Sequence, residues 1–234
     1  MKLEGKHIVI TGGSLGIGKE TAKMLVDKGA TVVITGRDKH RLEQASKYSG
    51  AFPLVFDISE LENIPSKTKE IIDLLKGRVD AIINNAGIGT FQKLEEVTKE
   101  DFEMIFQTNV FGLTLFTKEL IPVMKANDFG TIINIGSSAS IKGFASGSVY
   151  AASKFAVRAL TQCWQAELRP FNIRVCQINP SEVTTAFYNE DRLERQDESK
   201  KLSPTEIAHS ILSALEMDDK GFITELNVWA TNPF

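Results

Sequence analysis

Residues 6–18 read KHIVITGGSLGIG and decide the fold. The run Lys6–Thr11 is short and rich in β-branched residues, so it predicts a buried strand. A glycine-rich turn follows, and an amphipathic helix begins near Ile17. This order aims backbone N–H groups at a phosphate, because the first N–H groups of a helix have no partner within it. The next predicted strand, Thr31–Thr35, completes a β-α-β unit and favours a dinucleotide-binding site.

Strands and helices alternate along the rest of the chain. Further strands are predicted at Ala51–Phe56, Val79–Ile83, Thr131–Ile135, Arg174–Ile178 and Phe222–Trp229. Further helices are predicted at Ser66–Lys76, Thr98–Met124, Val149–Arg169 and Pro204–Met217. We therefore expect an α/β fold in which residues 1–234 form a single domain, with a doubly wound, seven-stranded parallel sheet flanked by helices. Residues 184–202 are mostly polar and charged, and we expect them to form a flap over substrate.

The composition excludes several classes of protein. The 234 residues carry a net charge of −3 without a block of basic residues, which argues against a nucleic-acid binder. No apolar stretch approaches the roughly 20 residues that span a membrane, and the N-terminus lacks the apolar core of a signal peptide. The two cysteines and three histidines show no metal-binding spacing. We expect a cytoplasmic protein that binds no metal, nucleic acid or membrane.

Tyr150 and Lys154 are four residues apart in a predicted helix, and residues at that spacing share one face. At about 5 Å and an effective dielectric constant near 20, one positive charge stabilises a phenolate by roughly 3 kcal/mol. That energy corresponds to about two pKa units. The pair is therefore a candidate general acid and base. A packed helix with a lysine that reaches solvent explains the same spacing.

The residues after the second predicted strand bear on the choice of cofactor. A carboxylate at this position suits the ribose 2′-hydroxyl of NAD, whereas an arginine nearby suits the 2′-phosphate of NADP. Here Gly36 and Arg37 follow Thr35. We therefore expect NADP(H) to be preferred over NAD(H). The alternative is that Arg37 is only a solvated turn residue.

Polar residues follow other predicted strands at their carboxyl ends, where ligands bind in open α/β sheets. They are Asp57 with Ile58, the run Asn84-Asn85-Ala86-Gly87, and Ser137 with Ser138. Asn109 lies within the long predicted helix 98–124, where asparagine is a poor helix former. A structural hydrogen bond, a kink or a catalytic role would explain it.

These motifs together resemble the classical short-chain dehydrogenase/reductase family, whose fold is a Rossmann fold. The similarity extends from about Lys6 to the last strand. Five motifs stand in the family's order: Thr11-Gly12 with Gly16 and Gly18, Asn84–Gly87, Asn109, Ser137 thirteen residues before Tyr150, and Tyr150-x-x-x-Lys154. Each motif is weak alone, but five in order on the expected elements are a specific match.

The resemblance implies the roles of the site residues. Tyr150 would donate a proton to a carbonyl oxygen, and Ser137 would hydrogen-bond that oxygen. Lys154 would lower the pKa of the phenol and hold the nicotinamide ribose, while Asn109 would hold a water that relays protons. With Arg37, the implied cofactor site comprises Gly12, Ser14, Leu15, Gly16, Ile17, Gly18, Asp57, Ile58, Asn85, Ala86, Gly87, Tyr150, Lys154, Pro180, Val183 and Thr185.

The chain departs from the family at three places. Ser181 stands where the family has glycine, Leu15 stands where many NADPH-preferring members have a basic residue, and the last strand lacks the common Val-Asp-Gly-Gly ending. Leu15 leaves Arg37 as the main predicted partner of the 2′-phosphate. The family usually forms homodimers or homotetramers through the two long helices, predicted here at 98–124 and 149–169.

The predicted substrate side is largely apolar, although core or oligomer packing would also explain its apolar members. It comprises Ser137, Ile88, Phe91, Phe144, Phe187 and Tyr188. We therefore expect an NADPH-dependent oxidoreductase that reduces a ketone or aldehyde to an alcohol, or catalyses the reverse reaction. A 3-oxoacyl-(acyl-carrier-protein) reductase is the alternative enzyme. An NADP(H)-binding sensor or scaffold is the alternative without catalysis.

Overall fold

Seven parallel strands form one sheet in the order β3-β2-β1-β4-β5-β6-β7. The computed structural model describes residues 1–188 and 191–232, without the side chain of Tyr188. The strands are β1 (His7–Ile10), β2 (Thr31–Gly36), β3 (Phe52–Val55), β4 (Ala81–Asn84), β5 (Gly130–Ile135), β6 (Ile173–Pro180) and β7 (Glu225–Val228). The predicted doubly wound Rossmann fold with a seven-stranded parallel sheet is confirmed, although β7 is shorter than expected.

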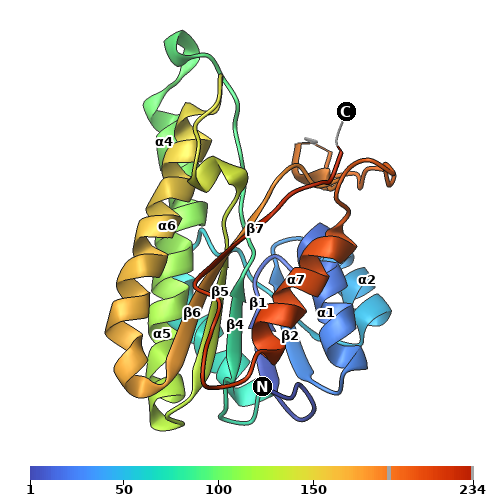
Figure 1. Cartoon of the computed structure of the whole chain (residues 1–234), viewed down its shortest axis with the longest axis vertical. Helices are drawn as coiled ribbons and strands as arrows, with labels where there is room; N and C mark the ends of the chain where they lie inside the picture. Colours follow the sequence, from blue (N-terminus) through green and yellow to red (C-terminus); the bar gives the residue numbers. More distant parts are fainter. Residues whose placement is uncertain (189–190, 233–234) are drawn as a thin grey trace.

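Helices cover both faces of the sheet (Figure 1). They are α1 (Gly16–Asp27), α2 (Lys39–Ser49), α3 (Ile64–Leu74), α4 (Lys99–Phe106), α5 (Leu113–Ala126), α6 (Ser148–Leu168) and α7 (Pro204–Glu216). In Figure 1, α1, α2 and α7 lie to the right of the sheet, and α4, α5 and α6 lie to its left. The central strands β1, β4 and β5 are therefore buried on both faces, which explains their β-branched runs.

The strand β1 shows how one short run supports two cores. Ile8 and Ile10 belong to the apolar cluster beneath α1 and α7, whereas Val9 belongs to the cluster beneath α3 and α5. Successive side chains of a strand point to opposite faces, so the three residues divide between the two layers. All three are fully buried.

The position of the site follows from the strand order. β1 pairs with β2 on one side and with β4 on the other, so the direction of winding reverses between β1 and β4. Ligands of open α/β sheets bind at this reversal, outside the carboxyl ends of the strands. The glycine-rich turn after β1 and the turn Asn84–Gly87 after β4 meet there.

The predicted long helix 98–124 is helical from Lys99 to Ala126, but it is not a regular α-helix throughout. A π-helical turn at Gln107–Gly112 separates α4 from α5, and Asn109 lies within it. The Asn109 side chain accepts a hydrogen bond from Ile88 N and donates one to Ile88 O, both at 2.9 Å. A structural hydrogen bond and a local irregularity therefore both explain this asparagine.

The helix α2 was not predicted, because its sequence KHRLEQASKYS is mostly polar and buries only Leu42, Ala45 and Ser49. Its end signals are nevertheless present in the sequence. The Asp38 side chain caps the N-terminus by accepting a hydrogen bond from Arg41 N, and Gly50 ends the helix in the left-handed conformation.

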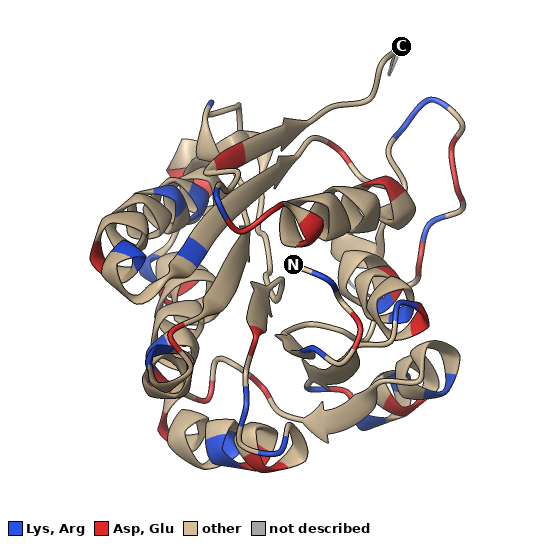
Figure 2. Ribbon diagram, turned by 60° about the horizontal axis from the view of Figure 1, so that its bottom comes forward, with Lys and Arg blue, Asp and Glu red and all other residues tan. Residues whose placement is uncertain are grey.

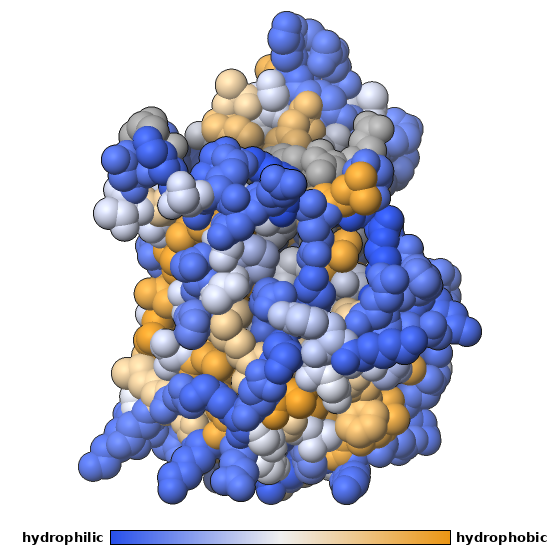
Figure 3. Space-filling view, turned by 90° about the vertical axis from the view of Figure 1, so that its right-hand side faces the viewer, coloured by the Kyte–Doolittle hydropathy of each residue, from blue (hydrophilic) through white to orange (hydrophobic). Residues whose placement is uncertain are grey.

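Charges of both signs are interspersed over the molecule (Figure 2). The surface over α1, α2 and α7 is mainly hydrophilic, with scattered apolar patches (Figure 3). On the other side of the sheet, the helices α4 and α6 and the π-helical turn expose Phe102, Met104, Phe111 and Phe155. No helix within residues 1–188 and 191–232 is both long and apolar enough to cross a membrane.

Candidate active site

A cleft opens at the carboxyl ends of β1, β4 and β5. All but one of the residues predicted to bind the cofactor line it: Gly12, Ser14, Leu15, Gly16, Ile17, Arg37, Asp57, Ile58, Asn85, Ala86, Gly87, Tyr150, Lys154, Pro180, Val183 and Thr185. The exception is Gly18, where an added Cβ would lie 2.4 Å from Gly12 O. Gly18 therefore allows α1 to approach the preceding turn, and it does not face the cleft.

Hydrogen bonds join the glycine-rich turn after β1 to the turn Asn84–Gly87 after β4 at the centre of the cleft. Asn85 Nδ2 donates hydrogen bonds to Thr11 O at 3.0 Å and to Gly12 O at 2.9 Å. In return, Thr11 Oγ1 accepts hydrogen bonds from the backbone N–H groups of Asn85 and Ala86. Gly12 has φ +65°, and a Cβ there would lie 2.8 Å from Ala86 Cα. Only glycine allows this approach of the two backbones.

The N-terminus of α1 already binds an anion, the carboxylate of Glu194 from the flap. This carboxylate accepts a hydrogen bond from Gly16 N at 3.0 Å. Lys19 Nζ donates to the same carboxylate at 2.7 Å. Burial opposes ionisation of Glu194, but the hydrogen bonds from Lys19 and Gly16 prevail and keep its pKa below the usual value. Since this turn holds a carboxylate, it fits the pyrophosphate of a dinucleotide.

Lys154 is buried at the inner wall of the cleft. Its Nζ donates a hydrogen bond to Ile135 O at 2.8 Å and lies 5.8 Å from the centre of the Tyr150 ring. Burial lowers the pKa of Lys154 from its ordinary value of 10.5 to about 8. The predicted pair thus lies on one side of α6, with both side chains facing inward.

Ser137 lines the same cleft, next to Tyr150 and Lys154. Its Oγ accepts a hydrogen bond from Ala139 N at 3.1 Å, which leaves its hydroxyl hydrogen available for an oxygen in the cleft. Asn109 lies behind the cleft lining. Its Oδ1 and Lys154 Nζ are both close to Gly87, where an added Cβ would lie 3.4 Å and 3.6 Å from them. The relay role of Asn109 stays a prediction.

Aromatic rings surround the phenol. The rings of Phe91 and Phe187 each lie 5.5 Å from that of Tyr150, measured between ring centres. Ile88 and Phe187 line the cleft, whereas Phe91 and Phe144 lie outside its lining. The ring centres of Phe144 and Phe91 are 6.0 Å apart, and the Phe144 side chain is half exposed. The side chain of Tyr188, also predicted here, lies outside the described residues.

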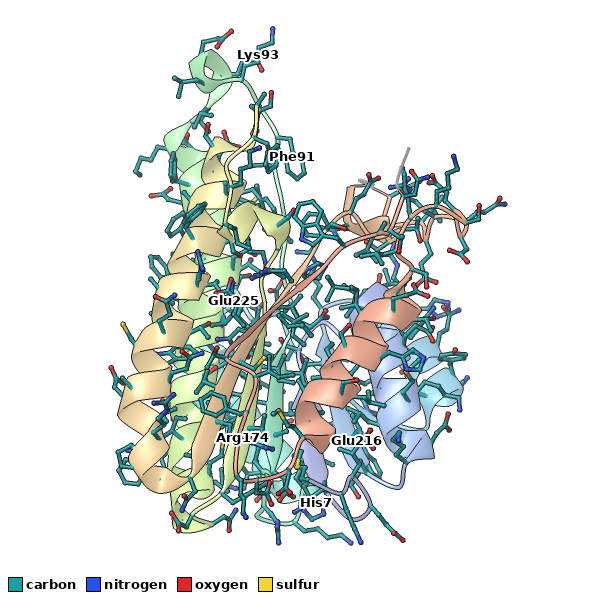
Figure 4. All side chains as sticks on the ribbon, in the orientation of Figure 1. His7, Phe91, Lys93, Arg174, Glu216 and Glu225 are labelled. Atoms are coloured by element: carbon teal, nitrogen blue, oxygen red, sulfur yellow. The ribbon has the colours of Figure 1, made fainter. Side chains whose placement is uncertain are left out.

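The loop that carries Phe91 precedes α4 and forms one end of the molecule (Figure 4). Figure 4 places His7, Arg174 and Glu216 at the opposite end, far from the cleft. Within the described ranges, no group of three or more histidine, cysteine or acidic side chains is arranged to hold a metal ion.

Several residues at the cleft were not predicted from the sequence, and three of them carry charges that bear on its chemistry. Arg41 and Arg192 line the cleft near Arg37, and Glu194 caps α1. Arg41 belongs to a helix that was not predicted, although it lies only four residues after Arg37. Arg192 and Glu194 belong to the flap, where the sequence predicted only Thr185 as a cofactor contact.

Comparisons with known proteins agree with this geometry. A family model described as short chain dehydrogenase matches residues 6–196. The 3-oxoacyl-(acyl-carrier-protein) reductase of Thermotoga maritima is 30% identical over 96% of this chain and 95% of its own length. The 3-dehydrosphinganine reductase of Danio rerio and the 3-ketodihydrosphingosine reductase of Bacteroides thetaiotaomicron are 32% and 35% identical over 88% and 79% of this chain. The matches span only 64% and 66% of the length of those two relatives.

Solved structures are similar over nearly the whole chain. A 3-ketoacyl-(acyl-carrier-protein) reductase from Brucella melitensis, complexed with NADH, has a TM-score of 0.88 at 30% identity and covers 99% of this chain and 100% of its own. A metagenomic short-chain oxidoreductase in complex with NADP has a TM-score of 0.86 at 29% identity, with 99% of each chain covered. A nicotinamide cofactor therefore fits the cleft. One of these two neighbours binds NADH and the other binds NADP.

The lowered pKa of Lys154 predicts how stability depends on pH. Between pH 8 and 10.5 the unfolded chain binds more protons than the folded chain, so stability rises with pH in this window. Below pH 8, burial of the charge costs about 3 kcal/mol. Without nucleotide, Lys154→Met should therefore be more stable than wild type by up to about 3 kcal/mol at pH 7, and the difference should shrink towards pH 10.

Urea denaturation at several pH values measures this difference. Lys39→Met is the matched control, because Lys39 is an exposed lysine whose side chain is 75% accessible. Its effect on the free energy of unfolding should not vary between pH 7 and 10. A difference between wild type and Lys154→Met that is independent of pH would show that the ammonium is not held at a cost.

Proposed function

The chain belongs to the short-chain dehydrogenase family of NAD(P)-dependent oxidoreductases, and from that premise we propose that it uses NADPH to reduce a lipophilic ketone or aldehyde, or catalyses the reverse reaction. One observation carries the proposal. Ser137, Tyr150 and Lys154 line the same cleft as a turn that binds an anion at the N-terminus of α1. A proton donor and a dinucleotide site thus share one cavity.

The chemistry follows from the groups in the cleft. When bound, the nicotinamide supplies the hydride. Tyr150 donates its phenolic proton to the carbonyl oxygen, and the Ser137 hydroxyl donates a hydrogen bond to the same oxygen. The Lys154 ammonium stabilises the negative charge left on Tyr150, because a buried charge is little screened by solvent. Lys154 would also hold the ribose hydroxyls.

The aromatic wall supports a lipophilic substrate. Phe91 and Phe187 flank the reacting phenol, and Ile88 adds apolar surface to the cleft. The names of the relatives specify a ketone at position 3 of a sphingoid base or an acyl chain. We favour a ketone carried on a long apolar chain for this protein too.

A 3-oxoacyl-(acyl-carrier-protein) reductase remains the alternative, favoured by the relative from Thermotoga maritima. An acidic carrier protein would need basic residues to dock on, and Lys125, Arg158 and Arg169 are the candidates. Arg158 is paired with Glu225 at 3.0 Å, Lys125 lies 3.8 Å from the centre of the Phe171 ring, and Arg169 lies over Phe222. Turnover of a carrier-linked substrate that falls steeply with salt would favour this alternative.

We propose that the protein is a homodimer or homotetramer and that it is located in the cytoplasm. The apolar side chains exposed on α4, α6 and the π-helical turn support the assembly, because such a patch is typical of an interface. Phe111→Glu should shift the molar mass measured by light scattering toward the monomer. Lys47→Glu, which changes an exposed residue of α2 on the other side of the sheet (Figure 1), is the control. A monomeric wild type would contradict the assembly.

Catalysis is tested with a panel of lipophilic ketones and aldehydes, following NADPH by its absorbance. Tyr150→Phe should lower kcat by about 1,000-fold or more, because general acid catalysis of this kind contributes roughly 10²–10⁴-fold. The dissociation constant of NADPH should change by less than about three-fold, since the ring remains.

Tyr48→Phe is the matched control, because Tyr48 is an exposed tyrosine on α2 that bonds to Glu20. It should leave kcat unchanged. If Tyr150→Phe retained more than a tenth of the wild-type kcat, Tyr150 would not be the acid. Tight NADPH binding without oxidation of NADPH by any carbonyl of the panel would favour a sensor or scaffold.

The cofactor preference is tested by the ratio of kcat/KM for NADPH to that for NADH. Arg37 is 61% accessible at the side of the cleft and lies 3.7 Å from Asp57. We expect a ratio above one in wild type and a fall of about ten-fold in Arg37→Ala, the loss expected for one charged hydrogen bond. Arg78→Ala, at the opposite end of the sheet, should leave the ratio unchanged. A wild-type ratio below one would refute the preference for NADPH.

A further inference from the structure

Three guanidinium groups from separate parts of the chain meet at the outer edge of the cleft. Arg37 follows β2, Arg41 lies in the first turn of α2, and Arg192 comes from the flap. All three line the cleft together with Asp38 and Asp57. In Figure 1 the flap, drawn in orange, runs above the side of the molecule that carries α1, α2 and α7.

Arg41 ties the flap to this edge. Its Nη2 donates a hydrogen bond to Asp191 O at 3.0 Å, and Asp191 directly precedes Arg192. The backbone of Arg192 is in the left-handed conformation, with φ +55°. An arginine rarely adopts this conformation, so the tertiary contacts of the flap hold it there.

The local charges favour an anion between these groups. Burial and then the positive charges of Arg37 and Arg41 lower the pKa of Arg192. The nearby carboxylates form ion pairs with the other two arginines. Asp57 is 3.7 Å from Arg37, and Asp38 is 3.5 Å from Arg41. A phosphate dianion would relieve the repulsion, and arginine binds phosphate in two-pronged geometry.

We propose that Arg192 and Arg41 complete, with Arg37, the site for the ribose 2′-phosphate of NADPH, so that the flap supplies a residue that recognises the feature distinguishing NADPH from NADH. This inference rests on the proposed use of NADPH. Arg192 is therefore a residue of cofactor specificity supplied by the segment that also carries Phe187 of the aromatic wall.

Glu194 makes a different contact from the same segment. It holds Gly16 N–H, where the pyrophosphate common to both cofactors is expected. Either cofactor must displace this carboxylate, so Glu194→Gln should change the affinities for NADPH and NADH by the same factor. Substitutions of Arg192 and Glu194 should therefore have separable effects. The first should change the ratio of the affinities for NADPH and NADH, and the second should change both affinities by the same factor.

The experiment measures dissociation constants by calorimetry for 2′,5′-ADP, 5′-AMP, NADPH and NADH. Arg192→Ala should weaken 2′,5′-ADP and NADPH by about ten-fold or more, the loss of one charged hydrogen bond. It should change 5′-AMP and NADH by less than about two-fold. Arg41→Ala should show the same pattern, and Arg192→Lys should recover part of the loss because it restores the charge.

Arg195→Ala is the matched control, because Arg195 is an arginine of the same flap that bonds to Glu182 and Glu198 outside the cleft. It should leave the ratio of affinities unchanged. If Arg192→Ala bound 2′,5′-ADP as tightly as wild type, or weakened all four ligands equally, the inference would be overturned. A wild type that does not distinguish 2′,5′-ADP from 5′-AMP would instead refute the proposed preference for NADPH.

Discussion

The buried positive charge of Lys154 is the constraint on which the rest of the site depends. An ammonium removed from water is costly unless hydrogen bonds replace its hydration. Here the carbonyl of Ile135, at the carboxyl end of β5, accepts a hydrogen bond from Nζ. The charge is therefore available beside Tyr150 only because α6 packs with this face against the end of that strand. The helix that carries Tyr150 and Lys154 and the end of β5 therefore form a single unit.

The irregular turn between α4 and α5 serves the same unit. Asn109 Nδ2 donates to Ser153 Oγ at 3.0 Å, and Ser153 Oγ donates to Tyr150 O at 2.7 Å. Ser153 lies between Tyr150 and Lys154 in the sequence, so Asn109 links the π-helical turn to the part of α6 that carries this pair. A π-helical turn costs stability relative to a regular helix and is frequently found at functional sites. The hydrogen bonds of Asn109 to Ile88 and Ser153 give that cost a physical reason here.

The sequence predicted those features that depend on local patterns. Buried strands such as β1 and β5 are continuous apolar runs, and the glycine spacing and the pair Tyr150 and Lys154 lie within single segments. It failed where a feature depends on distant partners. α2 buries little and was overlooked, and the π-helical turn depends on Ile88, which lies 21 residues before Asn109. Phe144 looked like a pocket residue because its apolar character does not reveal which way it points.

The flap is one segment of the sequence, but its residues contact several different parts of the cleft. Near its start, Thr185 lines the cleft, and the Phe187 ring lies 5.5 Å from that of Tyr150, measured between ring centres. Farther along, Glu194 reaches the N-terminus of α1, 178 residues away in the sequence. One short segment thus contacts the phenol of Tyr150, the N-terminus of α1 and, through Arg192, the edge of the cleft that Arg37 and Arg41 also line.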